Sequence, residues 1–338
     1  MKWVNCIWFN KIVKGFFTGL FLFLFILITG LNVSKRFILF DYYNKYHVER
    51  KIVGLNENFI PQGLGYSEEK DLTLQSGYLV GSNHCVIYLI DSEGKSKRIN
   101  IVNEDGSPYV GHCGGISVYK DFVYVSEDFI DGDYDVSNRL YIFSLTELLN
   151  TKNKGNIVNK NYITVDAEGA FVSNDGKYVY VGEYYYPKSF ETEKTHHVTT
   201  PNNIEQKAFV CAYEIDESKE NFLGELAYQI SIPDIAQGFA LQDGVCVISR
   251  SWGPAISKLG FYEIKESDMT SSSSGKEVPL YYVDDSTLIK NVKIPPMSEG
   301  VFIKDNRVFV YFESAGNKYI FGKLFNAYNI ISYPFITK

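Results

Sequence analysis

One hairpin pattern recurs five times along the sequence and constrains the fold more than any other feature. Its clearest copy runs from Ala167 to Tyr186, where the apolar pair Phe171 and Val172 precedes an Asn-Asp-Gly turn and a β-rich run. Glycine adopts the positive φ that tight turns require, so Asp-Gly between β-forming residues predicts two antiparallel strands. The other copies start at Pro61, Cys113, Ala236 and Ser298. A repeat of roughly 50–70 residues is typical of a β-propeller, with one repeat in each blade.

The repeats predict an all-β domain at residues 47–338, namely a five-bladed β-propeller with four-stranded blades. A strand precedes each hairpin and belongs to the previous blade, so the strand near Ile52 should close the ring by pairing with the last blade. We expect the third strand of that last blade at Tyr328–Tyr333. Two polar segments without periodicity, Pro187–Gln206 and Ser267–Lys276, are expected to be loops.

The N-terminal region predicts a membrane anchor. No charged residue occurs from Gly15 to Ser34, and twenty residues at about 1.5 Å each just span the hydrocarbon layer of a bilayer. Lysines in residues 1–14 favour a cytoplasmic N-terminus, residues 35–46 then form a stalk, and the domain lies outside the cytoplasm. Lys35 and Arg36 weaken this orientation, and a cleaved signal peptide is the alternative.

Charge and cysteine content narrow the classes of partner. The net charge of −7 argues against nucleic acid and permits cations or metal ions as ligands. No Cys-x-x-Cys motif occurs, so neither a zinc knuckle nor a redox motif is visible. We expect the cysteines to be packed, free thiols. They are Cys6, Cys85, Cys113, Cys211 and Cys246.

Two positions of each repeat are expected to meet at one mouth of the central channel, because the innermost strand of a blade starts at the face to which the second strand returns. The residues before the motif glycine are Gln62, Gly114, Glu168, Gln237 and Glu299. The residues that end the second strands are Gly77, Glu127, Glu183, Arg250 and Glu313. Gly114 provides no polar side chain at this position, and His112, two residues earlier, can supply one instead. Tyr184 and Trp252 follow two of the second strands.

Five glutamates around one axis repel one another unless a cation offsets them. Calcium takes about six to eight oxygens from carboxylates, amides and water, so the sequence predicts a calcium site. Its expected ligands are Glu168, Glu299, Gln62 and Gln237. The run Asp131–Asp135 is similar to part of a calcium loop but lacks the glutamate that such a loop needs. The alternative is structural: polar channel residues that hold ordered water, or glutamates that accept hydrogen bonds from backbone amides and fix the blades.

The Glu-Gly segments at Glu168 and Glu299 resemble the first strand of the gluconolactonase/senescence-marker family. This resemblance implies a calcium-dependent propeller that hydrolyses lactones and related esters, with Glu168 or Glu299 as the metal-ligand glutamate. The metal-binding asparagine and catalytic aspartate of the family have no match placed here, and the family usually has six blades. The Gly repeat, anchor and closing strand look more like membrane-anchored bacterial propellers, which implies the architecture and no reaction.

Two functions remain open at this stage. The first is an extracytoplasmic binding scaffold, in which the acidic mouth holds a small polar or cationic ligand or a metal ion, or the loops hold a protein partner. Ligand contacts would then come from Arg250, Tyr184, Trp252 and Glu313. The second is a calcium-dependent lactonase or esterase, in which calcium polarises the carbonyl and a nearby side chain moves the proton. The candidates for that proton transfer are Glu127, Glu183 and His112.

Overall fold

The computed structural model describes residues 2–127, 130–131, 134–135, 138–272 and 275–337. The chain divides into two compact units, Met1–Asn44 and Lys45–Lys338. The first unit contains helix α1 (Lys2–Ile38), and helix α2 (Phe40–Lys45) follows it. Within α1, the segment Val13–Ile38 has a mean hydropathy of 2.2 and is long and apolar enough to cross a membrane, a property that signal sequences share.

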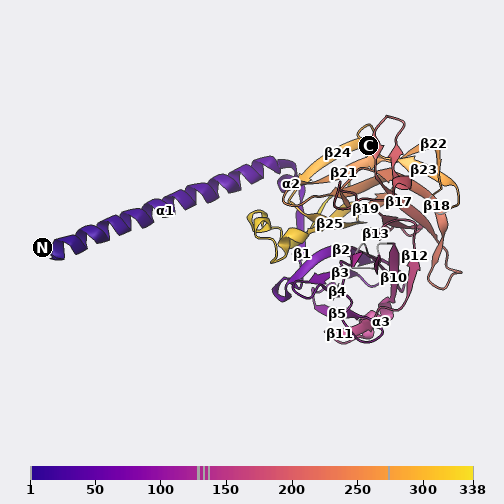
Figure 1. The fold of residues 1–338 in the computed structure, drawn as a ribbon, viewed down its shortest axis with the longest axis horizontal. Coiled ribbons are helices and arrows are strands. Elements are labelled where there is room, and N and C mark those ends of the chain that lie inside the picture. The colour runs from indigo at the N-terminus through magenta and orange to yellow at the C-terminus, as the bar shows by residue number, and fades with distance from the viewer. Residues whose placement is uncertain (1, 128–129, 132–133, 136–137, 273–274, 338) are drawn as a thin grey trace. The chain divides into compact units, whose positions relative to one another are not determined.

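The second unit is a five-bladed β-propeller whose blades follow one another around a ring in chain order (Figure 1), which confirms the predicted fold. Blade 1 consists of β2 (Phe59–Ser67), β3 (Leu72–Leu79), β4 (His84–Ile90) and β5 (Ser96–Val102). Blade 2 consists of β6 (Gly115–Tyr119), β7 (Phe122–Glu127), β10 (Arg139–Ser144) and β12 (Tyr162–Thr164).

The other three blades repeat the same antiparallel order of four strands. Blade 3 consists of β13 (Phe171–Asn174), β14 (Tyr178–Gly182), β17 (Ala208–Ile215) and β18 (Leu223–Ile232). Blade 4 consists of β19 (Ala236–Gln242), β20 (Val245–Arg250), β21 (Ser257–Glu263) and β24 (Leu288–Ile294). Blade 5 consists of β25 (Ser298–Lys304), β26 (Arg307–Phe312), β27 (Asn329–Pro334) and β1 (His47–Lys51).

Blade 5 joins the two ends of the propeller sequence. Strand β1 pairs antiparallel with β27, which places His47 opposite Ser332 and Lys51 opposite Asn329. The predicted closing strand before the first repeat and the predicted third strand at the C-terminal end are therefore both present. Closure of this kind removes the open sheet edges that a row of separate blades would expose.

Two blades carry additional strands at their outer edges. Strand β11 (Gly155–Val158) runs parallel to β5 of blade 1. The hairpin of β22 (Lys265–Ser271) and β23 (Val278–Tyr282) adds to β18 of blade 3. The expected loop at 267–276 is therefore wrong for residues 267–271, because β23 supplies a pairing partner that the polar composition of the segment does not reveal.

The predicted loop Pro187–Gln206 contains only short elements, namely η2 (Lys194–His196), β15 (Val198–Thr199) and β16 (Glu205–Gln206). Other short elements are η1 (Leu55–Glu57), β8 (Ile130–Asp131), β9 (Tyr134–Asp135), α3 (Leu145–Asn150), η3 (Glu313–Ala315) and η4 (Phe321–Phe325). The run Asp131–Asp135 falls on β8 and β9, except that residues 132–133 lie outside the described residues.

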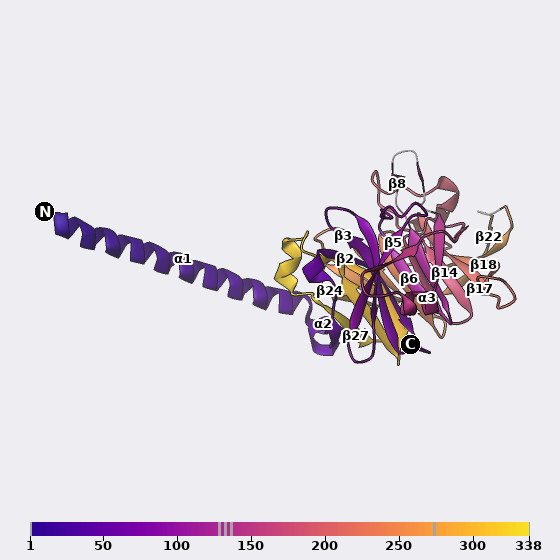
Figure 2. The same ribbon diagram turned by 90° about the horizontal axis from the view of Figure 1, so that it is seen from below.

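The innermost strands β2, β6, β13, β19 and β25 contact one another around the axis (Figures 1 and 2). A Cβ added at Gly115 would lie 2.2 Å from the backbone nitrogen of Val172 in the next blade. One added at Gly300 would lie 2.5 Å from that of Leu64. Neighbouring backbones therefore pack directly against each other, and the repeated glycine is required because no side chain fits between them.

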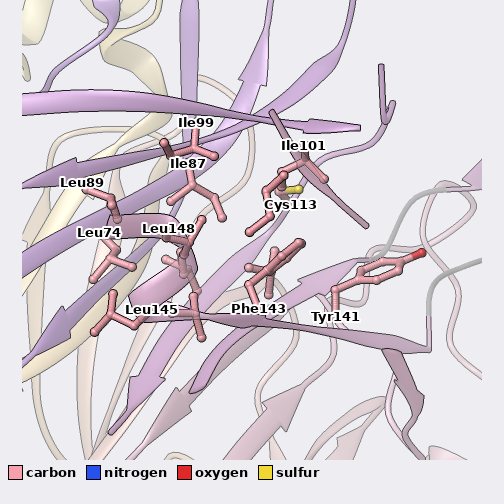
Figure 3. Close-up of a cluster of buried hydrophobic side chains, with 14 of the residues drawn as sticks. Leu74, Ile87, Leu89, Ile99, Ile101, Cys113, Tyr141, Phe143, Leu145 and Leu148 are labelled. Atoms are coloured by element: carbon pink, nitrogen blue, oxygen red, sulfur yellow. The ribbon is translucent and has the colours of Figure 1, made fainter. Parts of the chain in front are cut away.

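The core lies between the faces of neighbouring blades rather than along the axis. Between blades 1 and 2, Leu74, Ile87 and Leu89 pack against Phe143 and against Leu148 of α3 (Figure 3). Fully burying one such side chain contributes about 1.5–3 kcal/mol relative to leaving it exposed. The blades are therefore held together chiefly by apolar contacts. Polar side chains at the two ends of the ring are not needed for that packing and are available for hydrogen bonding or ligand contacts.

Candidate functional site

Glu127 ends the second strand of blade 2, and its side chain is completely buried. Its Oε1 accepts a hydrogen bond from the backbone N–H of His112 (2.9 Å). Its Oε2 accepts one from the N–H of Cys113 (3.2 Å) and one from the hydroxyl of Tyr109 (3.3 Å). A Cβ at Gly111 would lie 2.2 Å from Oε2, so glycine leaves room for the carboxylate. The Glu127 carboxylate therefore stabilises the chain segment that leads into β6.

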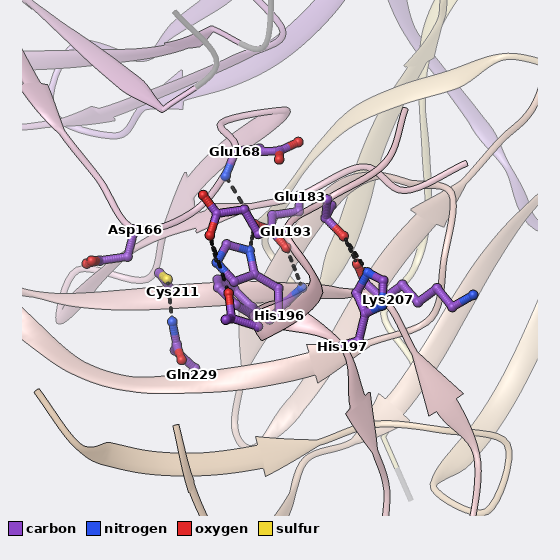
Figure 4. Close-up of polar contacts among 12 residues, drawn as sticks. Asp166, Glu168, Glu183, Glu193, His196, His197, Lys207, Cys211 and Gln229 are labelled. Carbon is purple, nitrogen blue, oxygen red and sulfur yellow. Dashed lines mark hydrogen bonds and ion pairs between the residues drawn. The ribbon is translucent and has the colours of Figure 1, made fainter. Parts of the chain in front are cut away.

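Glu183 occupies the same position in blade 3 and is equally buried. Its oxygens accept hydrogen bonds from the backbone N–H groups of Glu168 and Phe209, both at 3.2 Å. Its third partner is different, because Nδ1 of His196 lies 2.7 Å from its Oε1 (Figure 4). His196 belongs to the polar segment Pro187–Gln206, yet it is buried to 6 % exposure. The predicted loop thus folds back onto the blade.

The Glu183 carboxylate and the His196 imidazole form a buried hydrogen-bonded pair, and each group affects the pKa of the other. Burial raises the pKa of the Glu183 carboxyl above its usual value, and the hydrogen bond from His196 offsets part of that rise. Burial also disfavours a charged His196, but the hydrogen bond and charge of Glu183 outweigh it, and the pKa of His196 is raised overall. The folded protein therefore binds protons at this pair more tightly than the unfolded chain does.

Three of the predicted site residues, Gln62, His112 and Glu313, meet where blades 1, 2 and 5 come together. Burial raises the pKa of Glu313, and Tyr319, Lys318, His112 and Gln62 each offset part of that rise. The Tyr319 hydroxyl donates a hydrogen bond to Glu313. These contacts place a carboxyl group with a raised pKa beside an imidazole and an amide.

Tyr78 connects His112 to the same group. Its ring stacks on that of His112 at 5.8 Å, and its hydroxyl accepts a hydrogen bond from Lys318 Nζ at 3.1 Å. Tyr78 lies in β3, which continues past the predicted end at Gly77 and finishes at Leu79. Lys318 and Tyr319 lie in the irregular segment after η3 and carry no repeat signal in the sequence.

The remaining predicted ligand contacts lie in blades 3 and 4. Arg250 Nε donates to the backbone oxygen of Asp234 at 3.1 Å. Tyr184 is buried, and its hydroxyl donates to the backbone oxygen of Ser251 at 3.5 Å. Trp252 is 38 % exposed, and its ring stacks on Tyr186 with centroids 3.6 Å apart. Of these side chains, Trp252 presents a surface to solvent.

The four predicted calcium ligands come from four different blades. Glu299 is buried, whereas Glu168, Gln62 and Gln237 are half-buried. Their carboxylate and amide oxygens are the ligand types that calcium prefers. Among the described residues, however, neither Glu168 nor Glu299 belongs to a group of three His, Cys, Asp or Glu ligand atoms lying within 4.8 Å of one another. The calcium set therefore stays a prediction, based on the donor types alone.

A cavity of about 690 Å³ lies at the opposite end of the channel, where the innermost strands finish and turn. Every blade contributes to its wall. One lining residue from each blade, in chain order, is Tyr66, Ser117, Asn174, Gln242 and Phe302. The repeat places equivalent residues on the same side of the ring, so the sequence signal for this wall is the set of residues next to the five hairpin turns.

Hydrogen bonds and ring stacking order much of the cavity wall. Asn174 Nδ2 donates to Ser117 Oγ at 2.7 Å, which connects blades 3 and 2. The Tyr66 ring stacks on Phe302 at 5.6 Å, which connects blades 1 and 5. Ser173 also lines the cavity, and its buried hydroxyl has no hydrogen-bond partner within the described residues. Buried polar groups are nearly always paired, so this hydroxyl is a candidate for a ligand contact.

No family model matches this sequence, and no curated protein matches it. Solved structures with a similar fold include the GH43_1 enzyme from Xanthomonas citri complexed with xylose, at 10 % identity over 88 % of this chain and 92 % of that chain, with a TM-score of 0.45. A tail fiber of Staphylococcus aureus phage P68 is 11 % identical over 86 % of this chain and 53 % of that chain, with a TM-score of 0.43. A gluconolactonase from Xanthomonas campestris is 8 % identical over 86 % of this chain and 95 % of that chain, with a TM-score of 0.37.

Proposed function

We propose that this protein is a membrane-tethered, extracytoplasmic β-propeller that binds a small polar or cationic ligand in the cavity at the turn end of its channel. The observation that carries the proposal is the cavity itself, about 690 Å³ in volume, with walls from all five blades. Ligand pockets in proteins commonly measure about 300–1,000 Å³ and combine apolar walls with a few convergent polar groups. The hydroxyl of Ser173 and the stacked rings of Tyr66 and Phe302 supply both kinds of contact.

Charge at the cavity favours a ligand with positive charge or many hydroxyl groups. The acidic residues of the lining are Glu68, Glu69, Asp175 and Asp243. The single basic residue of the lining, Lys120, forms an ion pair with Glu217 at 2.5 Å. A cleft lined by one sign of charge raises the local concentration of oppositely charged solutes. An anionic ligand would instead meet an excess of carboxylates.

Isothermal calorimetry on the full-length protein in mild detergent tests this proposal. The probes are spermidine as an organic cation, sorbitol as a neutral polyol and citrate as an anion. We expect binding of spermidine or sorbitol and none of citrate. The double variant Glu68→Gln/Glu69→Gln should weaken spermidine binding, whereas Glu93→Gln, which removes an exposed carboxylate outside the cavity lining, should not.

A second variant distinguishes a built pocket from general attraction of cations. Ser173→Ala removes the unpartnered hydroxyl without changing the charge, and should weaken binding of whichever probe binds. Equal spermidine binding by all variants would show non-specific attraction to an acidic surface. Absence of binding for every probe would remove the support for a small polar or cationic ligand.

A lactonase or esterase is the second candidate function, and the Glu313 group favours it. Burial raises the pKa of Glu313, which interacts with His112 and Gln62, and a carboxyl group of this kind can serve as a general acid. When bound, calcium would polarise a carbonyl oxygen. Its proposed ligands remain Gln62, Gln237, Glu168 and Glu299. Melting temperatures measured with millimolar calcium and then with EDTA test the metal, and a lactone and ester panel on wild type and Glu313→Gln tests turnover. An unchanged melting temperature would exclude this function in its calcium-dependent form.

A further inference from the structure

Two cysteine thiols and a carboxylate meet between blades 1 and 2, next to His112, whose backbone N–H donates a hydrogen bond to that carboxylate. Cys85 lies on β4 of blade 1, Cys113 precedes β6 of blade 2, and Glu127 ends β7. The two sulfur atoms and one Glu127 oxygen all lie within 4.8 Å of one another. The three residues are buried, with exposures of 0 %, 1 % and 0 %. Chain segments far apart in sequence therefore converge on one point inside the domain.

We propose that Cys85, Cys113 and Glu127 bind a zinc ion. Thiolate sulfur and carboxylate oxygen are established zinc ligands, with bonds of about 2.3 Å and 2.0–2.2 Å. Three donor atoms within 4.8 Å of one another can reach a common centre at those lengths with small side-chain adjustments. Two sulfur donors favour zinc over calcium and magnesium, which prefer oxygen.

The charges balance when the metal enters. Each thiol loses one proton, so the ion exchanges two protons for its two positive charges. Burial holds the pKa of the Cys85 thiol well above its usual value. Without a cation the thiols therefore stay protonated, and zinc supplies the positive charge that stabilises them as thiolates.

The surroundings orient the donors before any ion arrives. Cys113 has φ of 51°, a left-handed conformation that is uncommon for a residue with a side chain. The N–H groups of His112 and Cys113 and the hydroxyl of Tyr109 donate hydrogen bonds to Glu127 and hold its carboxylate in place. Tyr109 is in turn held by Tyr141, whose hydroxyl lies 3.2 Å away. Such outer contacts commonly orient metal ligands in proteins.

The metal content of the full-length protein tests the proposal without reference to any activity. Protein purified from zinc-supplemented cells, with no chelator, is measured by inductively coupled plasma mass spectrometry. We expect about one zinc per chain. Cys85→Ser and Cys113→Ser should each lose most of the zinc, and Glu127→Gln should retain less than wild type. Cys246→Ser is the matched control, because it replaces an equally buried thiol that lies outside the group.

Cobalt exchange provides a second measurement that does not depend on the folding of the variants. Zinc is removed from wild type by a chelator in mild denaturant, and the protein is refolded with excess Co²⁺. A thiolate-to-cobalt charge-transfer band supports the site. Zinc-free wild type with no cobalt band after refolding overturns the proposal. It is overturned equally if thiol titration of the denatured, unreduced protein shows Cys85 joined to Cys113 in a disulfide.

Discussion

Glu127 of blade 2 and Glu183 of blade 3 occupy the same position of the repeat, yet they lie in different chemical surroundings. Both are fully buried, and both accept hydrogen bonds from backbone N–H groups close to the start of their blades. Beyond those bonds, Glu127 faces two thiols and a phenol, whereas Glu183 faces the His196 imidazole. The repeat therefore determines the backbone role of the glutamate. For Glu183, a segment outside the repeat supplies the imidazole that determines its chemistry.

The largest expected effect is on the blade 3 carboxylate. Glu183→Ala removes the acceptor of two backbone N–H groups and leaves His196 buried without its counter-charge. Breaking one partner of a buried charged pair costs about 3–5 kcal/mol. We expect that loss in the free energy of unfolding, measured by urea denaturation of the full-length protein in detergent. Glu193→Ala, which removes an exposed carboxylate 3.9 Å from His196, is the control and should change little.

The corresponding change in blade 2 should cost less. Glu127→Ala leaves the N–H groups of His112 and Cys113 without this acceptor, but it strands no imidazole. Buried groups that lose a partner cost about 1–3 kcal/mol. The same urea experiment should therefore rank Glu127→Ala between wild type and Glu183→Ala. Equal losses for the two variants would show that His196 contributes nothing to the difference between the blades.

The surroundings of Glu127 and of Glu183 should also differ in their response to pH. The pKa of His196 is raised above its usual value of 6.5, so its contribution to stability is complete below that pH and is lost as the pH rises through the raised value. As the pH rises from 6.5 through the raised pKa of His196, we expect the melting temperature of wild type to fall more steeply than that of His196→Gln. His197→Gln, a change at the adjacent histidine, should keep the wild-type slope. A wild-type slope in His196→Gln would assign the pH response to other groups.

The smallest expected effect concerns the phenol next to Glu127. Tyr109→Phe removes a hydroxyl that lies 3.3 Å from the carboxylate and 3.2 Å from the Tyr141 hydroxyl. A typical hydrogen bond contributes about 0.5–1.5 kcal/mol to stability, and we expect a loss of that size in urea denaturation. A loss as large as that of Glu127→Ala would mean that the hydroxyl, rather than the backbone N–H groups, is the main partner of Glu127.

The sequence is most informative where the structure is local and repeated. The hairpin turns predict five blades, and the strand near Ile52 predicts the ring closure that β1 and β27 form. Gln62 and Glu313 occupy the two repeat positions that are expected at one face, and both Gln62 and His112 lower the pKa of Glu313. In these cases the chemistry of a few neighbouring residues is enough to determine their place in the fold.

The sequence is least informative where partners come from distant or irregular segments. The burial of His196 depends on Glu183 and Phe209, which belong to blade 3 and not to the loop Pro187–Gln206. The hairpin of β22 and β23 depends on the outer edge of β18. The turn-end cavity depends on side chains from all five blades, and the composition of a single turn does not reveal a wall that five separate turns build together. The calcium ligands remain a prediction of the donor types.

Strand β1 is the segment that completes the ring, and in the chain it directly follows the N-terminal helices. If the helix is embedded in a membrane while the propeller holds something fixed, tension between the two acts first on the ladder from His47–Ser332 to Lys51–Asn329. That short ladder is then the mechanical weak point of the molecule. A pull strong enough to detach β1 would expose the edge of β27, so the integrity of the ring would then depend on the backbone hydrogen bonds of this one strand pair.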